Sequence, residues 1–215
     1  MPGIPKILLF DVDGVLIRPP AWFSDTLETT GYPGAKAALD AFYHSPEYRR
    51  CLLGQEDPSL AIQPWLRRIG WKRGSTAYLE AQYTYEGGFL DSSLLERVGR
   101  LRKAGIPCYL ATDQDPRRRE YLLESLGLGP LFDGYFVSSL LHAQKCMPEF
   151  WTRVLARLAR APGGLDPSAI LFMDDLEGNL AMAAAQGIST YRVVGPAGPE
   201  GLRSLLDTIV SQASQ

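Results

Sequence analysis

Short apolar runs recur along the chain, and charged residues, glycine or proline bound most of them. Five runs have the length of buried strands, at residues 7–10, 107–111, 135–137, 169–173 and, with a weaker pattern, 190–194. Continuous apolar runs of this length are typical of strands buried on both faces, as in parallel sheets. The pattern therefore predicts a sheet in the interior of the protein.

Segments with the spacing of amphipathic helices lie between and after these runs, at residues 92–104, 116–126, 148–160, 177–186 and 199–210. The second segment has Asp115 as a candidate N-cap, Pro116 as its first residue and Gly127 after its end, the usual residue types at those positions. Strands that alternate with helices predict an α/β fold, a doubly wound, Rossmann-like parallel sheet with helices on both faces. Such sheets bind ligands at the carboxyl ends of their strands.

The alternation is interrupted at residues 19–89, where we find no convincing strand pattern. Helical patterns there cover residues 21–29, 35–43, 47–53, 64–69 and 76–85. We expect a small all-helical cap domain at residues 19–89, inserted into an α/β catalytic core of residues 1–18 and 90–215. The insertion contains Trp22, Trp65 and Trp71, which we interpret as its own core; the alternative is that some of them line a pocket beneath it.

Two pairs of acidic residues stand at the ends of predicted strands. Asp11 and Asp13 follow the first strand, and Val12 between them points to the other side. Close carboxylates repel each other, so a buried pair needs a cation or a proton. A single pair is equally consistent with a strand-end turn. A second pair, Asp174 and Asp175, ends the fourth strand at the same edge of the sheet and favours a divalent cation such as Mg²⁺.

Between these acidic pairs, two more strand ends carry polar side chains. Thr112 follows the second predicted strand and precedes Asp113, and Lys145 lies after the third, just before a helix. A hydroxyl, a lysine and backbone amides at strand ends are the groups that hold a dianionic phosphoryl group.

The order of these motifs resembles the haloacid dehalogenase (HAD) superfamily. The resemblance rests on Asp-Val-Asp-Gly-Val-Leu from Asp11, then Thr112, then Lys145, and then Asp174-Asp175 with Asn179 four residues later. The insertion after the first strand is similar to the small helical cap of one subgroup. The resemblance covers essentially the whole chain.

This resemblance implies roles for the acidic residues. Asp11 would be the nucleophile that forms an aspartyl phosphate, which divides one difficult displacement into two easier ones. Asp13 would protonate the leaving oxygen and later take a proton from water. Mg²⁺ would be held by Asp11, by Asp13 through its backbone carbonyl, and by Asp175, with Asp174 as an outer or water-mediated partner.

The resemblance also places Thr112 and Lys145 on the oxygens of the transferring phosphoryl group, with Asp113 beside them among the substrate-binding residues. Two departures from the family pattern matter here. Asp113 stands where Asn is frequent, and Cys146 and Met147 intervene between the lysine and Pro148. They put the affinity for substrate and the orientation of Lys145 in doubt.

The expected activity is a Mg²⁺-dependent phosphatase that hydrolyses a small phosphorylated metabolite. Dehalogenases of the superfamily do not keep the second aspartate of the first motif, whereas Asp13 is present here. A phosphomutase remains an alternative, because it differs mainly in which group accepts the phosphoryl group. A catalytically weak binding or scaffold protein is a second alternative, suggested by the departures at Asp113 and Cys146. A response-regulator receiver is disfavoured by the 70-residue insertion.

The composition of the chain limits the classes of partner that we expect it to bind. The chain has 215 residues with 22 Lys and Arg against 24 Asp and Glu, so no overall positive field attracts nucleic acid or an anionic membrane. Three cysteines without a CxxC pair favour a reducing, cytoplasmic setting. No apolar run is long enough to span a membrane. We expect a monomer or homodimer. We interpret Arg117 to Arg119 as a solvent-exposed helix face; the alternative is a contact with the cap or the substrate.

Overall fold

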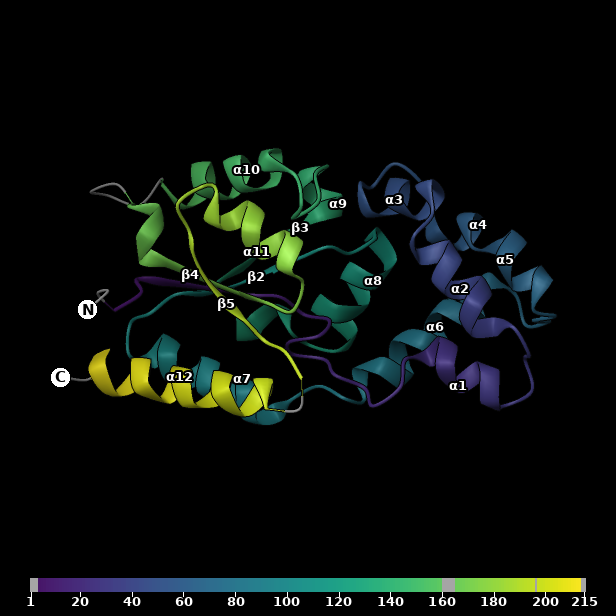
Figure 1. Cartoon of the computed structure of the whole chain (residues 1–215), viewed down its shortest axis with the longest axis horizontal. Helices are drawn as coiled ribbons and strands as arrows, with labels where there is room; N and C mark the ends of the chain where they lie inside the picture. Colours follow the sequence, from purple (N-terminus) through teal and green to yellow (C-terminus); the bar gives the residue numbers. More distant parts are fainter. Residues whose placement is uncertain (1–3, 160–164, 196, 214–215) are drawn as a thin grey trace.

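One parallel sheet of five strands, in the order β3-β2-β1-β4-β5, forms the centre of the protein (Figure 1). The computed structural model describes residues 4–159, 165–195 and 197–213. The strands are β1 (Ile7–Phe10), β2 (Cys108–Thr112), β3 (Gly134–Val137), β4 (Ile170–Asp174) and β5 (Ser189–Arg192). All neighbouring strands are parallel, so the predicted α/β sheet is confirmed.

The burial of the strands explains how well the sequence predicted them. Every residue of β1 and β4 is buried, and both strands read as continuous apolar runs. Strand β5 lies at an edge of the sheet and has no buried residue, which is why its pattern is weak. It ends at Arg192 rather than at residue 194 as predicted.

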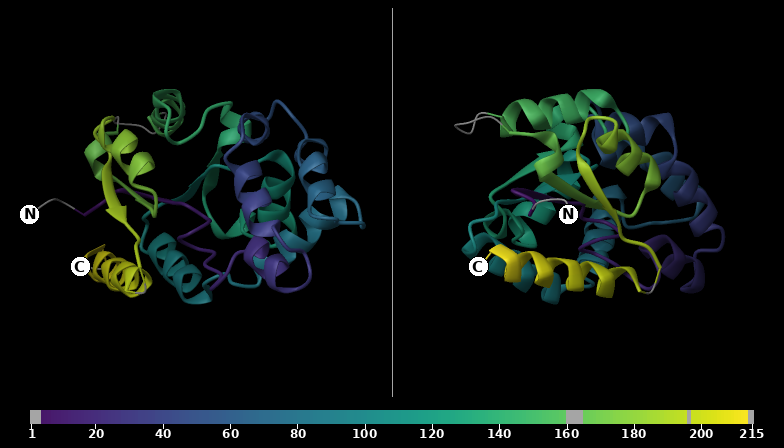
Figure 2. Two further views of the ribbon diagram at one scale, coloured as in Figure 1. Left: turned by 45° about the vertical axis from the view of Figure 1, so that its right-hand side comes forward. Right: turned by 60° about the vertical axis from the view of Figure 1, so that its left-hand side comes forward.

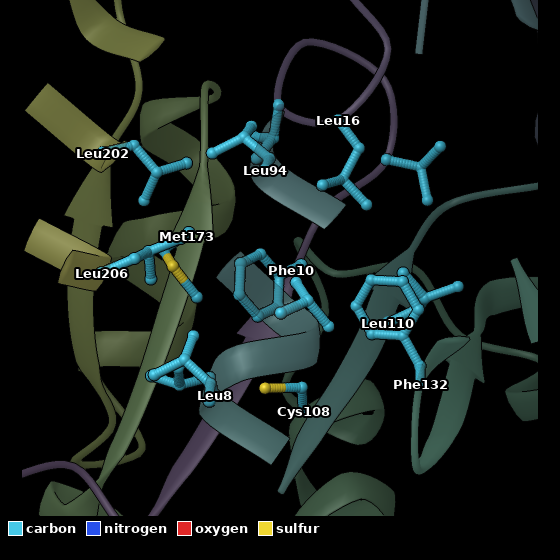
Figure 3. Close-up of a cluster of buried hydrophobic side chains, with 14 of the residues drawn as sticks. Leu8, Phe10, Leu16, Leu94, Cys108, Leu110, Phe132, Met173, Leu202 and Leu206 are labelled. Atoms are coloured by element: carbon cyan, nitrogen blue, oxygen red, sulfur yellow. The ribbon is translucent and has the colours of Figure 1, made fainter. Parts of the chain in front are cut away.

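Helices cover both faces of the sheet, as expected (Figure 1). They are α7 (Ser92–Lys103) and α12 (Gly198–Ala213) on one face, and α10 (Pro148–Leu158) and α11 (Glu177–Ala184) on the other. Alternate residues of β1 supply the two cores: Leu8 and Phe10 pack toward α7 and α12, whereas Leu9 packs toward α10. Figure 3 shows the first of these cores. Packing on both faces of the sheet thus fixes the positions of the carboxyl ends of the buried strands.

A separate group of helices follows β1 and precedes α7 in the sequence. In space these helices lie beyond the carboxyl ends of the strands (Figure 2). They are α1 (Phe23–Thr29), α2 (Ala35–Tyr43), α3 (Pro46–Leu52), α4 (Pro58–Ala61), α5 (Gln63–Arg68) and α6 (Ser75–Gly87). These helices have a core of their own, which includes Trp71 and part of Trp65, as predicted. Trp22 instead remains 39% exposed. The predicted helical insertion after the first strand is confirmed.

The two chain segments that connect this insertion to the sheet run side by side. Ile17 and Leu90 form an antiparallel bridge. The Asp91 amide donates to the Leu16 carbonyl at 2.8 Å. The insertion therefore leaves and re-enters the rest of the chain at one place.

Some elements differ from the prediction. Short helices α4 and α9 (Ser138–Leu141) were not expected, because four residues are too few to show a helical period. Helix α8 (Pro116–Glu120) continues as a π-helical turn (Tyr121–Ser125), a change of hydrogen bonding that the apolar spacing does not reveal. Within the described residues, no helix has both the length and the hydrophobicity needed to cross a membrane.

Candidate active site

Asp11 lies directly after β1, at the level where three neighbouring strands end. Phe10 is in register with Leu110 of β2 and with Met173 of β4, so the residues after these positions emerge together. The Asp11 amide donates to the Met173 carbonyl at 3.0 Å, and the residue is only 5% exposed. Burial raises the pKa of Asp11 well above its ordinary value, against the opposing effect of Lys145.

Lys145 forms ion pairs with the carboxylates of Asp11 and Asp174. Its Nζ lies 2.6 Å from Oδ2 of Asp11 and 2.7 Å from Oδ2 of Asp174. Burial lowers the pKa of Lys145, but these carboxylates outweigh that effect and raise it above its ordinary value. The backbone of Lys145 is also fixed, because its N–H donates to Oδ1 of Asp113 at 3.0 Å and its carbonyl accepts from the Trp151 indole at 2.7 Å. The lysine is therefore oriented despite the neighbouring departure at Cys146.

Asp174 and Asp175 behave differently although they are adjacent. Asp174 is fully buried, and its oxygens accept from Lys145, from the Leu176 amide at 2.7 Å and from the Asn179 amide group at 3.1 Å. Asp175 is partly exposed, and burial raises the pKa of its carboxyl. Because Asp174 has filled most of its acceptor positions, Asp175 is the freer oxygen donor of the pair.

The carboxylates of Asp11, Asp174 and Asp175 each offer an oxygen within 4.8 Å of the others. Such a set has the oxygen donors that a hard divalent cation prefers, and one lysine does not balance three negative charges. Gly14 makes room for the cluster: it has φ of +81°, and a Cβ atom there would overlap the Asp175 carboxylate. The residues present therefore fit Mg²⁺.

A cavity of about 180 Å³ lies at this cluster, and Asp11 and Asp175 line it. Its lining also includes the other predicted residues Asp13, Thr112, Asp113 and Lys145, together with Asn179 and the exposed Leu176. Thr112 is 2% exposed at the end of β2. The Asp113 carboxylate is engaged by the backbone amide of Lys145, and burial raises its pKa. The structure thus brings together Asp11, Asp13, Thr112, Asp113, Lys145, Asp174 and Asp175.

The Asp13 carboxylate is bound by two side chains outside the cluster of three carboxylates. Its Oδ2 accepts from Nε2 of Gln114 at 2.9 Å, and its Oδ1 accepts from Nη2 of Arg118 at 3.0 Å. Nη1 of the same arginine lies 2.9 Å from Oε2 of Glu86, on α6 of the insertion. The guanidinium also stands 5.0 Å from the ring of Tyr83. One buried cation therefore connects Asp13 to the insertion.

The interpretation of Arg117 to Arg119 as a solvent-exposed face was wrong for Arg118, which is 3% exposed. Asp115 caps α8 as predicted, accepting from the amides of Arg117 and Arg118, and this turn directs Arg118 toward the sheet edge. Sequence reasoning also missed Glu86 and Gln114. The position of Gln114, two residues after Thr112, could have identified it in the sequence. In the structure its Nε2 donates to the Thr112 hydroxyl at 3.1 Å.

Comparison with known proteins now identifies the family. Residues 5–187 match the family described as haloacid dehalogenase-like hydrolase. This span contains the carboxyl ends of β1, β2 and β4, the insertion, and every side chain of the candidate site. The chain belongs to the haloacid dehalogenase-like hydrolase family. The resemblance drawn from the four motifs is confirmed. No curated protein matches the chain of this HAD-like hydrolase.

Solved structures share the fold at low sequence identity. The HAD family enzyme BT-2542 of Bacteroides thetaiotaomicron, in complex with magnesium and inorganic phosphate, is 18% identical with a TM-score of 0.69, covering 89% of this chain and 96% of its own. A predicted HAD-like family hydrolase of Porphyromonas gingivalis is 20% identical with a TM-score of 0.69, covering 94% and 98%. A dehalogenase is 16% identical with a TM-score of 0.63, covering 88% and 84%.

A second cavity of this HAD-like hydrolase, of about 240 Å³, lies between the insertion and α8. It shares Asp13, Trp22 and Gln114 with the first cavity, so the two spaces adjoin at Asp13. Trp22, a residue of the insertion, thus lines both of these cavities.

Proposed function

We propose that this HAD-like hydrolase is a Mg²⁺-dependent phosphatase that hydrolyses a small phosphorylated metabolite through an aspartyl phosphate on Asp11. The observation that carries the proposal is the position of Lys145 Nζ, within 2.7 Å of both Asp11 and Asp174 beside a cluster of three carboxylates. A lysine and a cation side by side at a nucleophilic carboxylate suit the transfer of a dianionic group. The magnesium and phosphate bound to BT-2542 support this assignment.

Mg²⁺ would be held by Asp11 and Asp175, by Asp13 through its backbone carbonyl, and by Asp174 as an outer partner. The bonds from Leu176 and Asn179 to Asp174 support that division. When bound, the metal would neutralise charge on the carboxylates and on the phosphoryl group.

The proposed reaction has two steps. First, a carboxylate oxygen of Asp11 bonds to phosphorus and the ester P–O bond breaks, while Asp13 gives its proton to the leaving alcohol. Second, Asp13 takes a proton from water, the water oxygen bonds to phosphorus, and the bond between phosphorus and Asp11 breaks to release inorganic phosphate. Gln114 and Arg118, which hold the Asp13 carboxylate, would aim it at the leaving oxygen.

Lys145 and Thr112 would bind the oxygens of the transferring phosphoryl group. Because the Asp113 carboxylate accepts the Lys145 amide at 3.0 Å, we propose that Asp113 acts mainly by orienting the lysine. The insertion, taken as a cap domain of residues 19–89 on a core of residues 1–18 and 90–215, would cover the site and limit access of water.

Hydrolysis of an aryl phosphate with and without Mg²⁺ tests the proposal. We expect turnover that EDTA removes, and a loss of at least about 10³-fold in kcat for Asp11→Asn, because the amide cannot act as the nucleophile. Asp166→Asn, which changes an exposed cap of a short turn far along the chain, should keep full activity. Full activity of Asp11→Asn would refute the proposal.

The same assay separates the alternatives raised by the sequence. A phosphomutase would move the phosphoryl group between two hydroxyls and release little inorganic phosphate. A binding protein would turn over no phosphate ester. The departure at Asp113 no longer favours the second alternative, since this carboxylate supports Lys145.

A further inference from the structure

We propose that the alcohol released from the substrate carries a positive charge, so that the substrate is the monophosphate of an amino alcohol. This inference rests on the proposed phosphatase activity and specifies its substrate class. It derives from the second cavity, which begins at Asp13, the residue proposed to protonate the leaving oxygen. A phosphoryl group placed at Asp11 therefore directs its leaving group into this space.

The titratable side chains that line the second cavity are mostly acidic: Asp13, Asp40, Glu86 and Asp115. Burial raises the pKa of Glu86 and of Asp115, and Asp13 carries the transferred proton in the proposed first step, so the negative charge that the cavity offers a ligand comes mainly from Asp40. Among the described residues that line the cavity, Arg118 is the only lysine or arginine, and it already bridges Asp13 and Glu86. Nη1 of Arg118 makes no hydrogen bond but lies 2.9 Å from Oε2 of Glu86, and the described lining residues include no second lysine or arginine to bind a carboxylate or a second phosphate. An additional anionic group on the substrate would therefore meet the Asp40 carboxylate without a cation of its own.

Asp40 is the carboxylate most available to a bound cation. Its partner in the structure is Lys36, whose Nζ is 3.4 Å away on a side chain that is 53% exposed. Such a pair is largely screened by solvent. The Asp115 carboxylate, in contrast, is occupied by the amides at the start of α8. A positive group in the cavity would gain the attraction of Asp40.

Aromatic rings complete the lining. Trp22, Tyr43, Tyr48 and Tyr83 all face the cavity. Aromatic faces attract ammonium groups, most strongly where water is excluded. Tyr48 adds a polar contact: its hydroxyl makes no hydrogen bond to any residue that the structure describes, whereas Tyr43 donates to Gln82 at 2.6 Å. Rings together with the Asp40 carboxylate favour an ammonium group over a neutral hydroxyl.

A series of substrates that differ mainly in charge tests the inference. The probes are 2-aminoethyl phosphate, 2-hydroxyethyl phosphate and phosphoglycolate, with an aryl phosphate as the reference for activity itself. We expect kcat/KM for the amino ester to exceed that of the hydroxy ester by about tenfold and that of phosphoglycolate by about 100-fold. Added NaCl should reduce the ratio of amino to hydroxy ester.

Asp40→Asn should lower kcat/KM for the amino ester by about fivefold to tenfold and leave the hydroxy ester within about twofold. Glu80→Gln is the matched control: it removes an exposed carboxylate from α6 that does not line this cavity, and the substrate ratio should stay unchanged. The ratios measured on the unmodified enzyme keep the test valid even if Asp40→Asn folds poorly.

Equal or better turnover of the hydroxy ester or of phosphoglycolate would overturn the inference, and so would an Asp40→Asn variant with an unchanged ratio. In each of these outcomes the aryl phosphate is still hydrolysed. If the aryl phosphate and all three probes are inert, the proposed phosphatase activity fails instead.

Discussion

At position 14 the chain turns with φ of +81°, and the space above the backbone is filled by the carboxylate of Asp175. Glycine is the residue that adopts this conformation without cost and leaves this space open. Gly14 follows the first acidic pair in sequence, yet the contact that it permits is with the last pair. It therefore shapes the proposed metal site from a distance of more than 150 residues in sequence.

Gly14→Ala should weaken Mg²⁺ binding. The new Cβ would displace Asp175, and the left-handed backbone would cost about 1–2 kcal/mol for a residue with a side chain. We expect the Mg²⁺ concentration for half-maximal activity to rise about tenfold or more. Gly99→Ala is the control, since nothing lies within 4 Å of a Cβ there and α7 continues through it. Unchanged Mg²⁺ dependence in Gly14→Ala would contradict this account.

At the scale of secondary-structure elements, an ion pair joins α4 of the insertion to α8. Asp57 is the N-cap of α4, accepting from the Ser59 amide at 2.8 Å, and it also accepts two bonds of 2.7 Å from Arg117. Arg117 holds the pKa of Asp57 well below its ordinary value. The carboxylate therefore has two separable roles, one within its helix and one between elements.

Asp57→Ala should cost more stability than Arg117→Ala. Loss of the cap costs about 1–2 kcal/mol, whereas the ion pair, with side chains 38% and 42% exposed, contributes at most about 1 kcal/mol. Urea unfolding of the two single variants and of the double variant measures both quantities. Equal losses in the two single variants would show that the ion pair, rather than the cap, dominates.

Helices α6 and α8 meet at a group of buried charges in which one arginine serves two carboxylates. Burial raises the pKa of Glu86 to about 7, while Arg118 opposes this shift. In the unfolded chain the same carboxyl titrates near 4.5. Between these two values the folded state binds more protons than the unfolded state, so Glu86 makes the protein less stable as pH rises.

We therefore expect the free energy of unfolding to fall between about pH 5 and pH 8, with up to about 3 kcal/mol of the decrease due to Glu86. Glu86→Gln should reduce this decrease, because the amide does not titrate. Glu80→Gln, an exposed change on the same helix, should keep it. Denaturant unfolding of the three proteins at both pH values provides the comparison, and identical pH profiles would disprove the assignment.

For the molecule as a whole, the sheet brings like charges from β1 and β4 together at one edge. The three carboxylates of Asp11, Asp174 and Asp175 repel each other, and Lys145 offsets only part of this. A cation that binds the folded state alone would stabilise the entire fold through this edge.

Mg²⁺ at about 100 times its Kd should add about 2.7 kcal/mol of stability, which corresponds to a rise of about 5–10 °C in Tm. Asp175→Asn should raise Tm slightly without metal, since one repelling charge is gone, and should abolish most of the Mg²⁺ increment. Asp166→Asn should retain the full increment. Thermal melts with and without Mg²⁺ measure these shifts; an undiminished shift in Asp175→Asn would place the cation elsewhere.

The sequence predicted the residues that combine a strand end with a distinctive side chain. Asp11 and the Asp174-Asp175 pair were found because buried strands are visible as apolar runs and their carboxyl ends share one edge. Lys145 follows α9 rather than a strand, and it was found from its place in the order of motifs, just before a helix. Glu86 was not found, and a contact of Arg118 with the cap was only the less favoured interpretation. Their importance depends on how the insertion packs on α8, and neither residue stands at a strand end. The domain boundaries, the roles of the site residues and the cellular compartment stay predictions.

The sequence alone determined the layers of the fold and the family, because hydrophobic period and motif order are properties of the chain. Tertiary structure decided which charges share a partner: Lys145 lies between Asp11 and Asp174, and Arg118 lies between Asp13 and Glu86. It also decided that Trp22, rather than Trp71, lines the cavities. The Lys145 contacts depend on distances between the ends of neighbouring strands, and those of Arg118 and Trp22 depend on how the insertion packs on α8 and the sheet. Electrostatic and packing energies fall off over a few ångströms, whereas the residues involved are tens of positions apart in sequence.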